Sequence, residues 1–361
     1  VYRVAEYRPP EFLVDAVADS AIRYPGDSAT ASVEARYLFG APMARAALTW
    51  SARQVSIDFW QLEIPNTDGF YFGDSGWWWE EGQVDGSIQA IGQGSDTLDA
   101  GGRTRIRFAL APTVKGRPAR AILEASVTDV NRQSVAAQAS VMVHAASFYI
   151  GAQPLGQSYF WTAGEPQAIG VIAVRPDGGR LSGVKLRGTI VRREWHRVHR
   201  TRGGYSEVYG EWVSDTVGHC DLATTGADPA PCRFTPPAGG TYIVSFEGRD
   251  DAGRPVSTSL YRWATGKDFV PWNDESQFKM DVVPDKTRYS VGDTATVLFA
   301  SPFTDAEAWV TVEREGLIEQ RRLKLASGST TLKFPVTEAW PPNAFVSVLV
   351  ARGRSARPGP L

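Results

Sequence analysis

The sequence is poor in the residues that most often bind metals or carry catalysis. Its 361 residues include four histidines, two cysteines and three methionines. No apolar run reaches the roughly 18 residues that a membrane-spanning helix needs. Lysine and arginine number 38 against 40 aspartates and glutamates, so we expect no general attraction to nucleic acid or to an anionic membrane. The composition therefore gives little support to a metalloenzyme, a helical membrane span or a nucleic-acid-binding protein.

Familiar catalytic motifs are also missing. The sequence contains no Gly-x-Ser-x-Gly nucleophile turn, no His-Glu-x-x-His zinc motif and no phosphate-binding loop. The Gly-rich stretch GQGSDTLDAGG is not followed by a helical pattern that could orient a phosphate, so it predicts a turn. The acidic loop NTDGFYFGDSG lacks the ligand spacing of a calcium loop. We therefore predict no enzyme activity, no catalytic residue, no cofactor and no metal site.

The histidines require one further comparison. His196 and His199 lie three residues apart, and His219 precedes Cys220, so the region holds donors that zinc accepts. Residues three apart on a strand, however, face opposite sides of the sheet. We expect a solvated hairpin here, with a metal site as the alternative.

Apolar and polar residues alternate with period two along most of the chain. In SATASVEARYLF, one face carries Ala29, Ala31, Val33, Ala35, Tyr37 and Phe39. RTRIRFALA, TYIVSFEG and AWVTVERE follow the same pattern, which is typical of half-buried strands in antiparallel sheets. Turn sequences such as RPDGGR and DDAGR separate these runs at short intervals, as in sandwiches. The predicted fold is all-β.

The chain also repeats itself loosely. RYPGDSATASV at residues 23–33 resembles RYSVGDTATVLF at 288–299, and FWTAGEPQAIGVIAV is a weaker relative. Units of about 95–140 residues are the size of one sandwich. We therefore expect a tandem array of three antiparallel, immunoglobulin- or fibronectin-like β-sandwiches, at residues 1–147, 148–267 and 268–361.

The two cysteines, Cys220 and Cys232, flank a short loop rich in Gly, Asp, Pro and Thr. We expect them to form a disulfide, which would place the chain in an oxidising compartment and reinforce the fold locally. The alternative is a pair of free thiols in a cytosolic protein.

Tryptophan is unusually frequent, with 12 residues in all. Trp77, Trp78 and Trp79 are consecutive in FYFGDSGWWWEEG, and three successive strand positions cannot all face one core. We expect a long loop whose rings cover the open end of its sandwich. The alternative is an exposed platform for sugars or for a protein partner, as in a carbohydrate-binding or adhesin-type array.

A basic segment, KLRGTIVRREWHRVHRTR, could bind an anionic polymer. We expect instead a long hairpin whose charges prevent edge-to-edge pairing. Its basic residues are Lys185, Arg187, Arg192, Arg193, Arg197, Arg200 and Arg202.

Several stretches resemble the bacterial α2-macroglobulin family from end to end of the chain. EYRPPEF, RYPGD and YLFGAP are similar to the start of a macroglobulin-like domain, and SPFTDAEAWVTVEREG with PPNAFVSVLVARGR is similar to the domain just before the bait region. The resemblance implies a large periplasmic or extracellular protease inhibitor built from many such sandwiches. In that family a protease cleaves the bait region, the array rearranges, and the protease is trapped. The implied partners are endopeptidases and neighbouring macroglobulin-like domains, with the membrane reached only through a lipid anchor outside this chain. The chain starts at Val1, without Met and within a strand-like pattern, so we expect a piece of a longer protein.

The resemblance also implies a role for the last residues of the chain, and it gives neither cysteine a role in a thioester. Many family members form a thioester from a Cys-x-Glu-Gln motif, which neither Cys220 nor Cys232 matches. The tail ARGRSARPGPL lies where the bait begins. Arg352, Arg354 and Arg357 are targets for trypsin-like enzymes, and the following prolines resist regular pairing. The alternative is an unstructured chain end without function.

Overall fold

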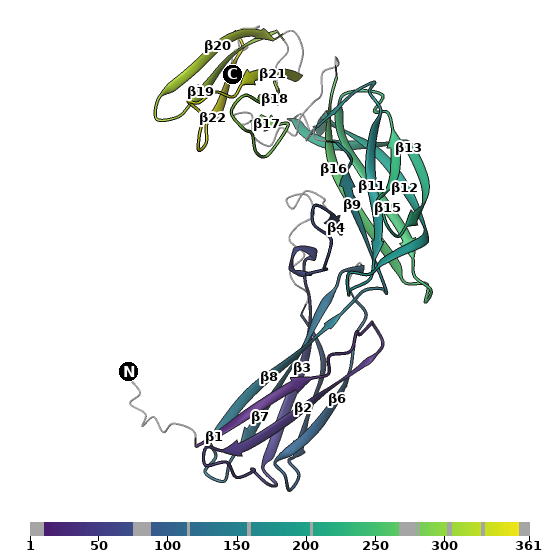
Figure 1. Ribbon diagram of the computed structural model, residues 1–361, viewed down its shortest axis with the longest axis vertical. Coiled ribbons are helices and arrows are strands. Elements are labelled where there is room, and N and C mark those ends of the chain that lie inside the picture. Colours follow the sequence, from purple (N-terminus) through teal and green to yellow (C-terminus); the bar gives the residue numbers. More distant parts are fainter. Residues whose placement is uncertain are drawn as a thin grey trace. The chain divides into compact units, whose positions relative to one another are not determined.

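The fold is known from a computed structural model, which describes residues 11–74, 88–113, 116–156, 160–202, 205–266, 280, 282–301, 305–325 and 329–353. At 195–202, 205–212, 300 and 329 the backbone alone is described. Strands make up almost all of the described elements, as the arrows of Figure 1 show, and one 3-10 turn, η1 (Phe59–Gln61), accompanies them. The all-β prediction is confirmed. Among these residues no helix is long and apolar enough to cross a membrane.

The chain divides into two compact units. The first comprises Val1–Gly151, Ala173–Leu181 and Glu247–Thr258. The second comprises Ala152–Ile172, Ser182–Phe246 and Ser259–Leu361. The division into three domains at residues 147 and 267 stays a prediction.

A two-layer sandwich forms most of the first unit. One sheet has the strand order β1-β2-β6, and the facing sheet has the order β5-β3-β7-β8. All neighbouring strands in both sheets are antiparallel. The strands are β1 (Phe12–Ala18), β2 (Ser28–Tyr37), β3 (Ala47–Ser56), β5 (Ile88–Thr97), β6 (Arg103–Ala109), β7 (Ala119–Thr128) and β8 (Ser134–Val143).

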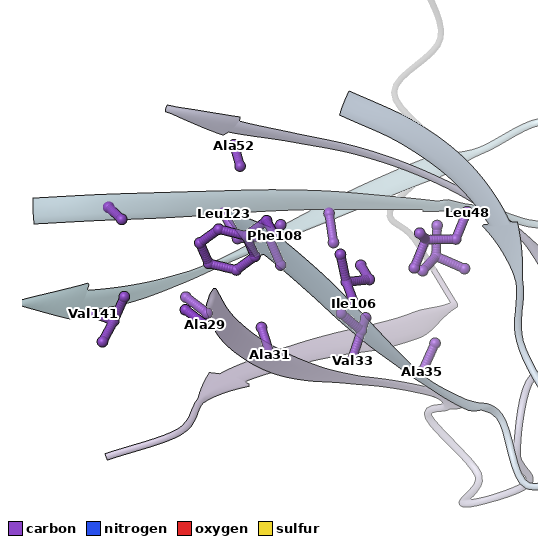
Figure 2. Packing of buried hydrophobic residues seen from close by; sticks show 14 of the residues in the cluster. Ala29, Ala31, Val33, Ala35, Leu48, Ala52, Ile106, Phe108, Leu123 and Val141 are labelled. Atoms are coloured by element: carbon purple, nitrogen blue, oxygen red, sulfur yellow. The ribbon is translucent and has the colours of Figure 1, made fainter. Parts of the chain in front are cut away.

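The core of this sandwich follows the alternation in the sequence. On β2, Ala29, Ala31, Val33 and Ala35 are all fully buried, and their small side chains leave room for larger apolar side chains of the neighbouring and facing strands. Figure 2 shows these residues below Phe108, with Leu123 on the opposite sheet. The predicted inward face of this strand is confirmed up to Ala35.

The alternation fails at the end of this strand. β2 ends at Tyr37, which is half-buried, and Phe39 lies in the following turn with 80% of its surface exposed. The two rings stack with their centroids 5.2 Å apart. The prediction that Phe39 continues the buried face is therefore wrong, because the chain leaves the sheet before this residue.

The middle of the chain, residues 149–265, contributes eight strands, which form one sheet with the two-residue β4 (Tyr71–Phe72). Its order is β10-β16-β15-β12-β11-β9-β4, with β13 on β12 and β14 on β11. In the second unit, the rings of Trp161, Phe234 and Tyr242 pack together with centroids 5.3–5.9 Å apart. The strands are β9 (Tyr149–Pro154), β10 (Trp161–Thr162), β11 (Gln167–Val174), β12 (Arg180–Arg202), β13 (Tyr205–Thr225), β14 (Ala230–Phe234), β15 (Gly240–Arg249) and β16 (Pro255–Thr265).

Two further sheets, β17-β18-β21 and β20-β19-β22, enclose a second apolar core near the C-terminus. Phe299 and Phe334 are its largest buried side chains, and Ala308, Val310 and Val312 of β19 face them. The strands are β17 (Val282–Pro284), β18 (Thr294–Ala300), β19 (Ala306–Glu313), β20 (Leu317–Leu325), β21 (Ser329–Pro335) and β22 (Phe345–Ala351).

The sequence repeat corresponds to a repeated local structure. Asp27 Oδ2 accepts a hydrogen bond from the Tyr24 amide at 2.8 Å, and Asp293 Oδ2 accepts one from the Ser290 amide at 2.9 Å. The aspartate before each repeat acts alike, since Asp19 accepts from the Thr30 amide and Asp285 from the Thr296 amide. The repeated motif thus closes the turn before β2 and the turn before β18 with the same side-chain type.

Candidate functional site

The C-terminal strand β22 is the element that precedes the predicted bait. It stands at the end of its described sheet and pairs with β19 through Leu349↔Trp309, Val350↔Ala308 and Ala351↔Glu307. Val346, Val348 and Val350 point inward and pack against the core, whereas the alternate residues are exposed. This packing fixes the strand up to its last residue.

The arginines of the tail follow this strand directly. Arg352 and Gly353 are exposed and come immediately after Ala351, the last paired residue. Arg354 and Arg357 lie outside the described residues. Of the three predicted target residues, the structure therefore places Arg352 at the exit from the sheet.

The outer face beside this exit carries an aromatic residue that the sequence analysis did not single out. Trp309 of β19 is 53% exposed and stands opposite Leu349, which is 64% exposed. Next to them, Arg322 forms an ion pair with Glu307 at 2.5 Å, and this hydrogen bond lowers the pKa of the Glu307 carboxyl. The period-two pattern of AWVTVERE places Trp309 on the outer face, so the signal was present in the sequence.

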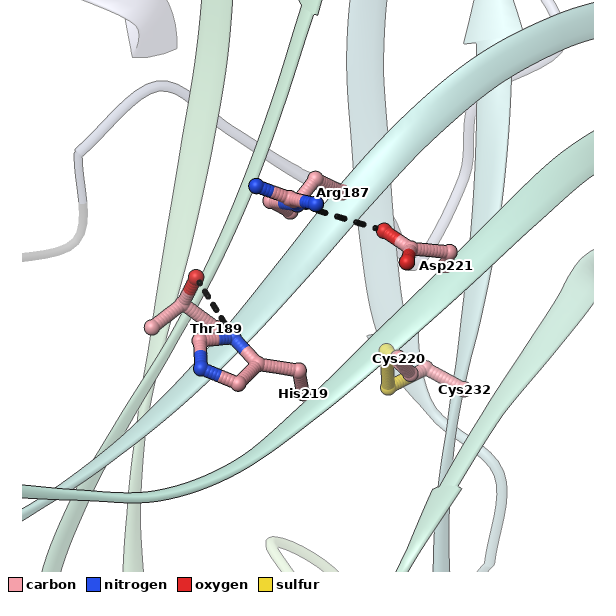
Figure 3. The surroundings of a disulfide bond; sticks show 6 residues. All are labelled: Arg187, Thr189, His219, Cys220, Asp221 and Cys232. Atoms are coloured by element: carbon pink, nitrogen blue, oxygen red, sulfur yellow. Dashed lines mark hydrogen bonds and ion pairs between the residues drawn. A yellow bond between two sulfur atoms is a disulfide. The ribbon is translucent and has the colours of Figure 1, made fainter.

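The two cysteines form a disulfide with their α-carbons 5.8 Å apart (Figure 3). Cys220 lies on β13, which pairs with β12, and the buried Cys232 lies on β14, which pairs with β11. The bridge therefore joins two strands that are not paired with each other in the sheet order.

The flanks of the disulfide carry ordinary surface contacts. Arg187 bonds Asp221 at 3.3 Å, and Thr189 Oγ1 lies 3.5 Å from His219 Nδ1, as Figure 3 shows. Within the described residues no group of three or more His, Cys, Asp or Glu could hold a metal ion. The side chains of His196 and His199 lie outside the described part.

The basic segment forms the expected hairpin. β12 pairs with β13 in antiparallel register, and several basic residues of β12 stand opposite acidic residues of β13. Arg187 is opposite Asp221, Arg192 opposite Asp215, and Arg200 opposite Glu207. Opposite charges on paired strands stabilise a sheet and reduce its net charge. The hairpin therefore offers less positive charge to an anionic polymer than its first strand suggests.

A buried polar cluster in the first unit lies where the first predicted boundary falls. His144 Nδ1 shares a hydrogen bond of 2.7 Å with Tyr149 Oη, and the His144 amide donates to the Arg23 carbonyl. Burial lowers the pKa of His144 to about 4 and raises the pKa of Tyr149. His144 is therefore neutral at neutral pH.

Asp250 holds the other half of this cluster. Its fully buried carboxylate accepts hydrogen bonds from the Ser147 amide at 3.0 Å and from Arg254 Nε at 2.7 Å. Burial alone would raise the Asp250 pKa, but these hydrogen bonds outweigh it and the pKa is lowered. The Arg254 guanidinium also lies 4.0 Å from the centroid of the Tyr24 ring. The sequence analysis treated DDAGR as a turn only, because the partner that ties Asp250 to the rest of the unit, the Ser147 amide, is 103 residues away.

The Trp-rich loop is described only in its first part, and Trp77, Trp78 and Trp79 lie outside the described residues. The described part is attached within the first unit by Arg180, which donates to the Asn66 carbonyl at 2.7 Å and lies over the Phe70 ring. Thr258 Oγ1 donates to the Gly73 carbonyl at 2.9 Å. The predicted roles of the three tryptophans stay predictions.

Two family models match this chain. The bacterial α2-macroglobulin MG5 domain matches residues 14–144, which contain the first sandwich. The α2-macroglobulin bait region domain matches residues 280–359, which contain the C-terminal sheets and most of the tail. The chain belongs to the bacterial α2-macroglobulin family.

Curated α2-macroglobulins match over nearly the whole chain. An α2-macroglobulin homolog of Nostoc sp. is 28% identical over 98% of this chain and 18% of its own length. The α2-macroglobulin of Xylella fastidiosa is 25% identical over 98% of the chain and 21% of its own length. The chain thus spans about a fifth of the length of these relatives.

Solved α2-macroglobulins are also similar. The match to the native conformation of Escherichia coli α2-macroglobulin covers 98% of this chain and 23% of that protein's chain, with 19% identity and a TM-score of 0.48. The match to Salmonella α2-macroglobulin reacted with methylamine covers 96% of this chain and 23% of that protein's chain, with 18% identity and a TM-score of 0.48.

The match to the α2-macroglobulin bait region domain continues beyond the end of β22. It extends from Met280 past Ala351, the last residue of the strand, and so includes all three tail arginines. The part of the chain beyond the sheet is therefore included in the family's bait region domain.

Proposed function

We propose that this chain is a scaffold segment of a bacterial α2-macroglobulin that inhibits proteases by trapping them after bait cleavage. Its sandwiches would act as stiff plates without catalysis of their own, and the tail after β22 would be the start of the bait. The protein would work in the periplasm or outside the cell, where an oxidising environment preserves the Cys220–Cys232 bridge.

One observation carries this proposal. The match to the bait region domain continues beyond the last paired residue of β22 into a segment with three arginines. A protease binds its substrate as an extended strand, so a cleavable segment must not be paired in a sheet. The exposure of Arg352 and Gly353 just after Ala351 supports this role.

Capture of a protease by the longer protein that carries this chain tests the proposal. After incubation with trypsin and gel filtration, we expect trypsin to elute with the inhibitor, together with a cleaved bait. A matched variant, with Arg352, Arg354 and Arg357 all changed to Gln, should capture less trypsin. Trypsin that elutes free after cutting the tail would contradict trapping.

A further inference from the structure

The segment between β3 and β5 supplies β4 to a sheet that otherwise consists of β9–β16, which we call the middle sheet. In that sheet β4 stands next to β9. We propose that residues 57–74, the described part of this segment, are a strap that holds Ala173–Leu181 and Glu247–Thr258 on the first sandwich, so that these parts move as one body when the bait is cut. The behaviour after bait cleavage rests on the proposed function, whereas the strap itself does not.

Arg180, the first residue of β12, binds the strap through two contacts. It donates a hydrogen bond to the Asn66 carbonyl at 2.7 Å, and its guanidinium lies 5.0 Å from the centroid of the Phe70 ring. A guanidinium over an aromatic face adds a cation–π attraction to the hydrogen bond. Because Asn66 and Arg180 are 114 residues apart, these contacts join the strap to the turn between β11 and β12.

The same turn lies directly against the strap backbone. Gly178 is buried there, and a β-carbon on it would lie 2.7 Å from the Pro65 carbonyl oxygen and 2.9 Å from the Pro65 β-carbon. Its φ of +86° also favours glycine. A side-chain contact can adjust by a change of rotamer, but this contact of backbone with backbone cannot. The turn and the strap therefore fit in one arrangement.

The last residues of the strap are held by buried groups. Thr258 of β16, which is 1% exposed, donates from Oγ1 to the carbonyl of the buried Gly73 at 2.9 Å. The Phe59 ring lies against Gly73, and it is perpendicular to the Tyr149 ring with the centroids 6.1 Å apart. A buried carbonyl without a hydrogen-bond donor costs free energy, so this end of the strap stays bound.

The turn between β15 and β16 has contacts of its own with the first sandwich. The Ser147 amide donates to Asp250, and the Arg254 guanidinium lies over the Tyr24 ring. Domains of one chain move relative to each other unless their interface is extensive. Here the strap and this turn hold the same body at several places. Loss of one contact should therefore loosen the strap without unfolding the sandwich.

Hydrogen exchange of the 361-residue chain, measured by mass spectrometry, tests the strap. Arg180→Ala should speed the exchange of the protected amides in residues 57–74 by at least about tenfold and leave β2 and β7 unchanged, because the strap opens locally. Arg175→Ala is the matched control, since this exposed arginine of the same turn pairs with Asp177 within the turn. Equal exchange of the strap in the two variants would overturn the proposal.

A double-mutant cycle isolates the contact between the turn and the strap. Arg180→Ala and Phe70→Ala remove the same ring contact, so the shift in urea midpoint of the double variant should be smaller than the sum of the two single shifts. Arg175→Ala combined with Phe70→Ala should give additive shifts. Additive shifts for the Arg180 and Phe70 pair would show that the ring contact does not fasten the strap.

The longer protein that carries this chain tests the movement as one body. After trypsin has cut the bait, we expect exchange in residues 57–74 to stay within about twofold of that in the uncut protein. Faster exchange of the strap after the cut would overturn the inference of one body. Gel filtration of the same sample measures the capture of trypsin. A loss of capture with an unchanged strap would contradict the proposed function alone.

Discussion

Gly188 lies directly opposite Cys220 in the β12–β13 ladder, and its lack of a side chain provides the space for the disulfide. A β-carbon at Gly188 would overlap the Cys220 sulfur and would lie 3.0 Å from the Phe246 ring. Phe246 is itself fully buried, so the ring cannot yield into solvent.

Replacement of this glycine should therefore destabilise the second unit. We expect Gly188→Ala to lower the free energy of unfolding by about 1–3 kcal/mol, the usual cost of overpacking. The matched control is Gly316→Ala, where an added β-carbon has no neighbour within 4 Å. Denaturant titration of both variants gives the comparison. Equal stability of the two would contradict the packing argument.

Removal of the disulfide should have a separate effect. The double variant with Cys220→Ala and Cys232→Ala should lose about 2–3 kcal/mol, because the bridge closes a loop between residues 12 apart and joins strands that do not pair. A reductant should lower the urea midpoint of the original chain and leave that of the variant unchanged. If reduction frees both thiols without moving the midpoint, the bridge contributes no stability.

The carboxylate of Asp250 should be required for the polar cluster of the first unit. Asp250→Asn leaves Arg254 without its 2.7 Å partner and weakens the bond from the Ser147 amide, so we expect a loss of about 2–3 kcal/mol. The neighbouring, exposed Asp251→Asn is the control. Thermal unfolding should separate the two variants, and a small equal effect would mean that the cluster does not stabilise the unit.

His144 should make the first unit less stable in mild acid. Its pKa is lowered to about 4 in the fold, so between the ordinary value of about 6.5 and 4 the unfolded chain binds a proton that the folded chain excludes. Stability should therefore fall as the pH falls through this window, by roughly 3 kcal/mol in total. The lowered pKa of Asp250 acts in the same direction but only below about 3.9, its ordinary value.

Denaturant titrations across this window check the prediction for His144. His144→Gln should flatten the pH dependence between about pH 6.5 and 4. His219→Gln, which replaces an exposed histidine at a strand surface, is the matched control. A steep pH dependence that survives His144→Gln would assign the effect to other groups.

Local patterns in the sequence predicted the strands and their buried faces better than the contacts between residues far apart in the sequence. The alternation identified the buried faces of β2 and β19, because a period of two is a property of a single strand. It failed at Phe39, where the strand ends. The contact between Asp250 and the Ser147 amide and the space above Gly188 both depend on residues far apart in the sequence, and no local pattern carries that pairing.

Mild trypsin treatment, followed by a measurement of the stability of the remaining chain, tests whether stable sandwiches precede a cleavable tail. We expect the tail to be removed first and the trimmed body to keep its β-sheet circular dichroism spectrum, with a melting temperature within about 2 °C of that of the untreated chain. Early cuts inside the sandwiches with the tail still attached, or a trimmed body that has lost its cooperative unfolding, would show that the sandwiches are not a stable scaffold ahead of a cleavable segment.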